Sequence, residues 1–255
     1  MKILLTNDDG YNAQGILALY EALRPDHEII LIAPDREKSA VSHGITLNAP
    51  IRIDKINLRN QGVGYSISGT PADCVKLGLF KFYSSPPDLV ISGINPGSNT
   101  GVNINYSGTV GAAKEAALNG ILSISASIIK KGKKLDFKGM AQFISQIVHK
   151  IHDSSLTSNL PFGTFLNINA PDIPIDKVRG IKITSQASDN LSKQFEERID
   201  PRNRSYYWYA GIDRIEGKGN TDVNALLENY ISITPIQCDM TDYNTLSKLK
   251  SLKLP

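Results

Sequence analysis

Residues 1–34 read MKILLTNDDGYNAQGILALYEALRPDHEIILIAP, and this opening stretch decides the fold class. Apolar residues 3–5 run into an acidic loop, after which apolar side chains recur at helical spacing up to Pro25. Residues 29–32 are continuously apolar rather than alternating, as expected of a strand that is covered on both faces in a parallel sheet. The stretch therefore predicts a strand, a helix and a second, parallel strand.

The same alternation of strands and helices continues through the first 170 residues. Buried strands are predicted at residues 89–91, 121–124 and 164–168, and helices at residues 110–118 and 137–151. This order predicts an α/β domain with a doubly wound, mostly parallel sheet.

The pattern changes in the last third of the chain. Pro171 and Pro174 interrupt it, and the later segments 182–184 and 230–234 alternate between apolar and polar residues. Alternation is typical of strands that cover a core on one face only, so we expect antiparallel hairpins here. The predicted parts are a catalytic domain, residues 1–170, and a C-terminal β-hairpin extension for oligomerisation, residues 171–255.

Composition excludes several classes of protein. A chain of 255 residues with 41% apolar and 21% charged residues can bury a sizeable core. The net charge of +3 is spread over scattered lysines and arginines, so we expect no nucleic-acid duplex as a partner. No run approaches the roughly 20 apolar residues of a membrane span, and the N-terminus lacks the apolar region of a signal peptide. Two distant cysteines, Cys74 and Cys238, favour a reducing, cytoplasmic location.

Polar side chains follow three of the predicted strands. Asp8 and Asp9 come after the first strand, Ser39 lies beyond the second, and Asn95 follows the strand at residues 89–91. Ligands of open α/β sheets bind beyond the carboxyl ends of the strands, so these oxygen atoms are expected to converge. Two adjacent carboxylates with hydroxyl and amide oxygens suit Mg²⁺ or Mn²⁺.

A simpler interpretation of the acidic loop stays open. Asp8 could merely cap the following helix, and Asp9 with Gly10 could form a turn. Taken alone, the sequence Asp-Asp-Gly favours that simpler interpretation. The convergence of three strand ends is what favours a metal site.

The glycine-rich loop at residues 93–101 leads to Ser107, Gly108 and Thr109 at the start of the Ala-rich helix. Free backbone amides at a helix N-terminus point toward an anion, so this loop predicts a phosphate site. The alternative is that Ser and Thr only cap the helix and that small residues only allow close packing.

Short blocks along almost the whole chain resemble the SurE family of 5′/3′-nucleotidases. The matching blocks are KILLTNDDG (2–10), APDR (33–36) with Ser39 and Ser42, GTPADCV (69–75), SGINPG (92–97), YSGTVGAA (106–113), LNIN (166–169), DPR (200–202), TDV (221–223) and YISITP (230–235). The chain departs from the family pattern at three places. Ala40 stands where relatives often have Gly after Ser39, Thr184-Ser185 where they often have Thr-Arg, and Asn229 where Gly commonly precedes Tyr230.

The resemblance implies a fold, a site and an activity. It implies a Rossmann-like domain with a C-terminal hairpin exchanged between subunits of a homodimer or tetramer. One divalent ion per subunit would assist hydrolysis of nucleoside 5′- or 3′-monophosphates, with Asp8 also helping to activate the attacking water. The implied metal ligands are Asp8, Asp9, Ser39 and Asn95, and the implied phosphate-binding residues are Asn99, Ser107, Gly108 and Thr109.

Two other classes of protein compete with this interpretation. A dinucleotide-binding oxidoreductase would use Asp35 to bind a ribose, but the first loop lacks GxGxxG and its acids would repel a pyrophosphate. A receiver-like signalling module also has an acidic pair after its first strand, but it needs a phosphate-accepting Asp where this chain has Asn95. Ser39 as a covalent nucleophile is disfavoured, because no base accompanies it in the sequence.

Overall fold

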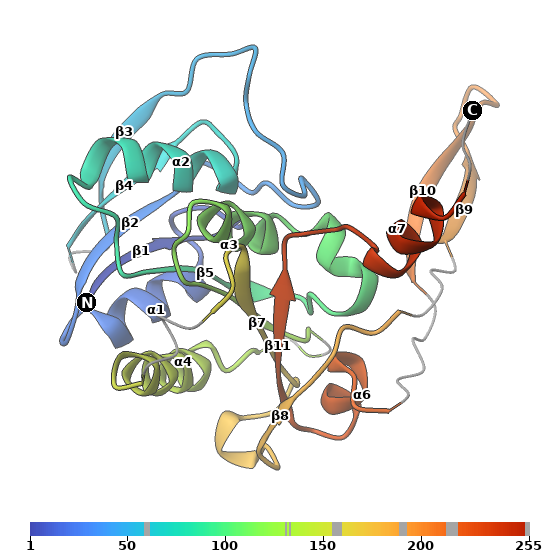
Figure 1. Ribbon diagram of the computed structural model, residues 1–255. Helices are drawn as coiled ribbons and strands as arrows, with labels where there is room; N and C mark the ends of the chain where they lie inside the picture. Colours follow the sequence, from blue (N-terminus) through green and yellow to red (C-terminus); the bar gives the residue numbers. More distant parts are fainter. Residues whose placement is uncertain are drawn as a thin grey trace.

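A computed structural model (Figure 1) describes residues 1–58, 62–130, 132, 134–154, 160–188, 193–212 and 219–252, with only the backbone described at 193, 194 and 210–212. The strands of the main sheet are β1 (Lys2–Thr6), β2 (Glu28–Pro34), β3 (Ile53–Asn57), β4 (Val63–Ile67), β5 (Leu89–Pro96), β6 (Ser123–Ile128), β7 (Thr164–Ala170), β8 (Ile181–Ile183) and β11 (Ile231–Gln237). The helices are α1 (Gln14–Leu23), α2 (Pro71–Phe82), α3 (Gly108–Leu118), α4 (Phe137–His152), α6 (Asp222–Leu227) and α7 (Tyr243–Lys250), with 3-10 turns η1 (Gly101–Tyr106) and η2 (Ile175–Lys177).

These nine strands form one sheet in the order β3-β4-β2-β1-β5-β6-β7-β11-β8. From β1 the chain proceeds outward through β2 to β4, and it then returns to β5 and proceeds the other way through β6 to β7. All neighbouring pairs from β4 to β7 are parallel, which confirms the doubly wound α/β prediction. The winding reverses between β1 and β5, which is where ligands bind in such sheets.

Helices cover both faces of the central strands. On one face Ile3 and Leu5 pack in a core with α1 and α4, and on the other Leu4 packs with α2 and α3. This explains why residues 3–5 are apolar without alternation. Because a core covers each face of β1, the polar residues that follow its carboxyl end are where this strand could meet a ligand.

The C-terminal third contains the predicted antiparallel hairpin, but the alternating segments do not form it. The segments near 182–184 and 230–234 are strands, but β8 and β11 pair parallel to each other at the end of the main sheet, and β11 runs antiparallel along β7. The separate antiparallel hairpin is formed instead by β9 (Lys193–Ile199) and β10 (Ser205–Ile212). Alternation identified the strands, but it carries no information about which strand is the partner.

The hairpin projects from the body of the molecule (Figure 1). Its turn is held by Asp200, whose carboxylate accepts hydrogen bonds from the backbone of Arg202 and from the backbone and side chain of Arg204. Among the described residues, no helix has the length and apolar character needed to cross a bilayer.

Candidate active site

The chain turns sharply where β1 ends. The side chain of Asn7 is buried, donates to the carbonyl of Gly10 at 2.9 Å and accepts from the Gly10 N–H at 3.1 Å. Gly10 has a φ of +99°, a backbone conformation that favours glycine. Asp8 and Asp9 therefore occupy a fixed turn at the carboxyl edge of the sheet.

Asp8 joins this turn to the start of α3. Its Oδ1 accepts a hydrogen bond from Thr109 Oγ1 at 2.5 Å, and only 6% of the residue is exposed. A Cβ on Gly108 would lie 2.9 Å from the Cβ of Asp8, so only glycine allows this approach. Burial raises the pKa of Asp8, and the hydrogen bond from Thr109 offsets part of the rise.

Asp9 carries a polar atom without a partner. Its Oδ2 is buried and has no hydrogen bond within the described part of the chain. Burial first, and then the charge of Asp8, raises the pKa of Asp9 to about 7. A buried, unpaired carboxylate oxygen beside a second carboxylate is costly unless a cation neutralises it, so the pair fits a divalent ion.

Asn95 reaches the same edge from β5. The strand continues to Pro96, beyond the predicted end at residue 91, although its pairing with β6 shifts register between Ser92 and Asn95. A Cβ on Gly93 would lie 2.4 Å from the carbonyl oxygen of Ala126, which explains a glycine at this irregularity. The Asn95 amide nitrogen donates to the Gly97 carbonyl at 2.7 Å, and its oxygen is the end suited to a cation.

Ser39 lies on the exposed connection between β2 and β3. Its Oγ donates to Glu37 rather than to another predicted ligand. The backbone nearby is tied to the site, because the Lys38 N–H donates to the Asp8 carbonyl at 2.7 Å. Within the described residues no group of three or more His, Cys, Asp or Glu could hold a metal, so an ion here would need two carboxylates and neutral oxygens.

The N-terminus of α3 lies beside these carboxylates. Ser107 caps the helix, with its Oγ accepting from the Val110 N–H at 3.1 Å. Ser107 and Thr109 are both buried. The N–H groups of Gly108 and Thr109 belong to the first turn and have no acceptor within the helix. They offer an anion site in contact with Asp8.

Asn99 is held by the strands of the sheet rather than by the start of α3. Its side-chain nitrogen donates to Ser127 Oγ at 2.8 Å, and its N–H donates to Asn169 Oδ1 at 2.8 Å. Its carbonyl accepts from the side chains of Asn167 and Asn169. These bonds anchor the glycine-rich loop to β6 and β7, and direct contact of Asn99 with a phosphate stays a prediction.

Sequence reasoning missed a carboxylate that supports this loop from the C-terminal third. Asp222 is buried, and it accepts from the N–H groups of Gly101 at 2.8 Å and Ala187 at 3.0 Å. Gln186 donates to the Gly101 carbonyl at 2.8 Å. The block TDV was visible in the sequence, but nothing local indicates a partner 121 residues away.

Two cavities are each lined by one of the predicted site residues. Asp9 lines one of about 550 Å³, together with Lys130, Lys134 and the apolar Phe137. Ser107 lines another of about 530 Å³. Either is large enough for a small organic ligand.

Comparisons with known proteins identify the family and the fold. A family model described as survival protein SurE matches residues 3–193. A protein named 5′-nucleotidase SurE from Desulfatibacillum aliphaticivorans is 45% identical over 100% of this chain and 99% of its own length. A protein of the same name from Pelotomaculum thermopropionicum is 45% identical over 99% of this chain and 95% of its own length. The crystal structure of the SurE protein from Aquifex aeolicus superposes with a TM-score of 0.84 at 37% identity, covering 98% of each chain.

Proposed function

Because the chain belongs to the SurE family, we propose that it is a divalent-metal-dependent 5′-nucleotidase that hydrolyses nucleoside 5′-monophosphates to nucleoside and phosphate. The observation that carries the proposal is the unpaired, buried Oδ2 of Asp9 beside Asp8 and the start of α3. Carboxylates at one side and helix amides at the other suit a cation and a phosphate that lie next to each other.

Asp8, Asp9, Ser39 and Asn95 would hold one Mg²⁺ or Mn²⁺ ion. All four supply hard oxygen atoms, which these ions prefer. When bound, the ion would neutralise charge on the oxygens of the transferring phosphoryl group. Ser39 Oγ would have to give up its hydrogen bond to the Glu37 carboxylate in order to bind the ion.

The remaining residues position the phosphate and the water. The N–H groups of Gly108 and Thr109 and the hydroxyl of Ser107 would hold phosphoryl oxygens, because phosphoryl transfer depends mainly on positioning and charge stabilisation. Oδ1 of Asp8 is fixed by Thr109, so its other oxygen would accept the proton of the attacking water. Asn99 would hold the loop and add a phosphate contact.

The experiment is phosphate release from a panel of substrates, measured with Mg²⁺, with Mn²⁺ and with EDTA. We expect activity on nucleoside 5′-monophosphates with either ion, weaker activity on 3′-monophosphates, and none in EDTA. Stable phosphorylation of the protein would favour a receiver, and metal-free binding of a nicotinamide cofactor would favour an oxidoreductase. Full activity after exhaustive chelation would disprove the metal assignment.

We also propose that the chain is a cytoplasmic homodimer or tetramer built through its hairpin. Phe195 and Trp208 on the hairpin are 62% and 58% exposed, and Leu249 on α7 is 47% exposed. Such apolar surface is typical of interfaces. Cys74 and Cys238 are free, as expected in a reducing compartment. Light scattering of the full chain tests the assembly, and a monomer at micromolar concentration would contradict it.

A further inference from the structure

The connection between β2 and β3, residues 35–52, carries Ser39 and has few apolar contacts of its own. Residues 39 and 40 are exposed, and Ile45 and Leu47 are 42% and 79% exposed. Ala40 and Ser42 have φ values of +56° and +55°, which are unfavourable for side chains other than glycine. A segment like this does not hold its shape by burial, so its polar contacts must position Ser39.

One face of α3 receives this connection. Gly108, Gly111 and Glu115 are spaced i, i+3 and i+7, so they lie along one side of the helix. A Cβ on Gly111 would lie 2.4 Å from the carbonyl oxygen of Ser42, and a Cβ on Gly108 would lie 3.1 Å from the side chain of Val41. The two glycines therefore let residues 41–43 lie directly against the helix.

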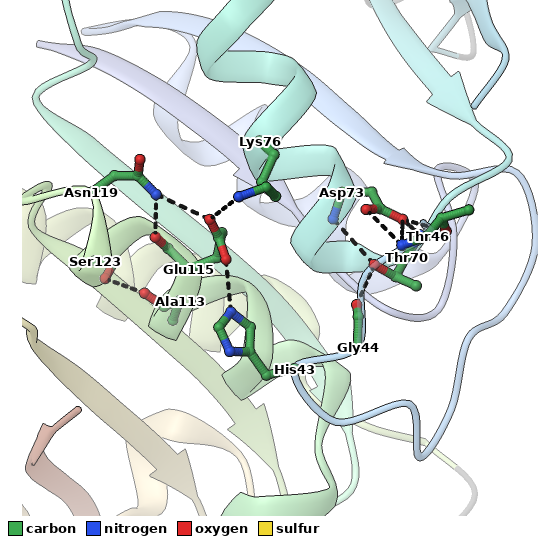
Figure 2. A network of polar contacts seen from close by, with 10 residues as sticks. All are labelled: His43, Gly44, Thr46, Thr70, Asp73, Lys76, Ala113, Glu115, Asn119 and Ser123. Atoms are coloured by element: carbon green, nitrogen blue, oxygen red, sulfur yellow. Dashed lines mark hydrogen bonds and ion pairs between the residues drawn. The ribbon is translucent and has the colours of Figure 1, made fainter. Parts of the chain in front are cut away.

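Glu115 completes this face and binds the connection through His43. Figure 2 shows its carboxylate between three side chains: His43 Nε2 lies 2.8 Å from Oε2, and Lys76 Nζ and Asn119 Nδ2 each lie 3.1 Å from Oε1. The Glu115 side chain is 7% exposed. The hydrogen bond with His43 is the main cause that lowers the pKa of Glu115 to about 2, so the carboxylate is charged.

A second anchor follows directly along the chain. Thr70 donates to the Gly44 carbonyl at 2.7 Å, and Asp73 accepts from the N–H and hydroxyl of Thr46 (Figure 2). This anchor attaches the connection to α2, whereas His43 attaches it to α3. Of these two side-chain anchors, only the His43 bond reaches α3, the helix whose N-terminus lies beside Asp8.

We propose that His43 and Glu115 are positioning residues that hold the Ser39 segment against α3, so that Ser39 is preorganised for the metal site. The inference rests on the proposed function, because it takes Ser39 as a metal ligand. His43 lies four residues after Ser39. On either side of Ser39, the Lys38 N–H donates to the Asp8 carbonyl and the Ser42 N–H donates to the Tyr106 carbonyl. Loss of the His43 bond would therefore loosen this segment against α3 without removing any proposed metal ligand, while the bonds of Lys38 and Ser42 remain.

The test compares His43→Ala with His43→Gln and Lys76→Gln in the full chain. The glutamine side chain can place an N–H near the position of His43 Nε2 and so restore the bond to Glu115. Lys76→Gln is the matched control, because it removes the other cation from Glu115 and leaves the Ser39 segment attached. Two quantities are measured: the Mn²⁺ dissociation constant, by calorimetry, and amide hydrogen exchange of Lys38 and Ser42 in EDTA.

We expect His43→Ala to weaken Mn²⁺ binding about tenfold and to speed exchange at both amides, with kcat near that of the parent at saturating Mn²⁺. His43→Gln should recover most of the affinity, and Lys76→Gln should resemble the parent. Unchanged exchange and unchanged Mn²⁺ affinity in His43→Ala would overturn the inference. If the parent itself binds no Mn²⁺, the proposed function fails, and the metal-free exchange still shows whether His43 holds the segment.

Discussion

Asp8 and Asp9 are neighbouring carboxylates at the end of a buried strand, and burial raises the pKa of both. Each also disfavours the ionised form of the other. The protein therefore keeps an electrostatic cost at this position that a bound cation would remove. The same reasoning separates a metal site from a simple helix cap, because a cap would be stabilising without any ion.

Asp8→Asn should abolish turnover yet leave the metal-free protein as stable as the parent or slightly more stable. The amide removes one charge, and its oxygen can still accept from Thr109. Excess Mg²⁺ should reverse the ranking, since an ion bound only by the folded state contributes about 2.7 kcal/mol at a hundredfold excess over its dissociation constant. Thermal melts of both proteins with EDTA and with Mg²⁺ measure this.

The control is Asp54→Asn, because Asp54 is an exposed carboxylate on β3. This variant shows how much the loss of one negative charge alone changes the melting temperature. If Asp8→Asn melts far below the parent in EDTA, Asp8 is mainly structural. If Mg²⁺ stabilises the parent and Asp8→Asn equally and Asp8→Asn still hydrolyses substrate, Asp8 is neither a metal ligand nor a catalytic residue.

Glu115 predicts how stability depends on pH. Its pKa is lowered from 4.5 to about 2 in the folded protein, so its contribution is complete above pH 4.5 and is lost as pH falls toward 2. We expect the parent to be about 1–3 kcal/mol more stable than Glu115→Gln at pH 7, with the difference shrinking between pH 4.5 and pH 3. Urea unfolding at several pH values measures it, and a difference that does not depend on pH would show that Glu115 acts by shape alone.

Helices and strands could be predicted from the sequence where burial fixes the pattern of their apolar residues. The strand at residues 3–5, the helix before Pro25 and the strand at residues 29–32 are confirmed as β1, α1 and β2. β3 was not predicted, because it lies at the sheet edge with a mostly exposed surface and shows no clear periodicity. The irregular end of β5 was also missed, since it depends on close contact with β6 rather than on its own sequence.

The sequence likewise identified candidate site residues but not the contacts between residues that lie far apart in the chain. Asp8 and Asp9 could be found because they directly follow a strand. The contact between Asp8 and Thr109 spans 101 residues and that between His43 and Glu115 spans 72, so neither follows from spacing along the chain. These contacts depend on how α3 packs beside β1.

Gly111→Ala tests the close contact between α3 and the segment that carries Ser39. The added methyl group would lie 2.4 Å from the Ser42 carbonyl, so the Ser39 segment must move. Although alanine favours helices, we expect a net loss of about 1–3 kcal/mol in unfolding free energy together with weaker Mn²⁺ binding. Leu118→Ala, at the exposed end of the same helix, is the control. Parental Mn²⁺ affinity in Gly111→Ala would contradict the close approach.

At the scale of the whole molecule, the C-terminal third completes the sheet as well as forming the hairpin. β11 pairs with six residues of β7, and Asp222 holds the glycine-rich loop. The sequence predicted strands in this third but could not show that two of them extend the main sheet, since pairing depends on contacts between distant segments.

Truncation after residue 170 should therefore give aggregated or unfolded protein, because it exposes the edge of β7 and removes the support of the loop. Circular dichroism and light scattering of residues 1–170 measure this. Replacing only residues 193–212 with a short flexible linker is the control, and it should leave a folded chain with weaker self-association. A soluble, folded 1–170 fragment would show that the last third is independent.

The most direct test follows Mn²⁺ occupancy and phosphate release in one sample. Electron paramagnetic resonance counts bound ions as Mn²⁺ is added, while phosphate is measured from a nucleoside 5′-monophosphate. We predict that both rise together, that they saturate at about one ion per chain, and that Asp9→Asn loses both. Phosphate release at the full rate before any ion is bound, or undiminished Mn²⁺ binding by Asp9→Asn, would contradict the account.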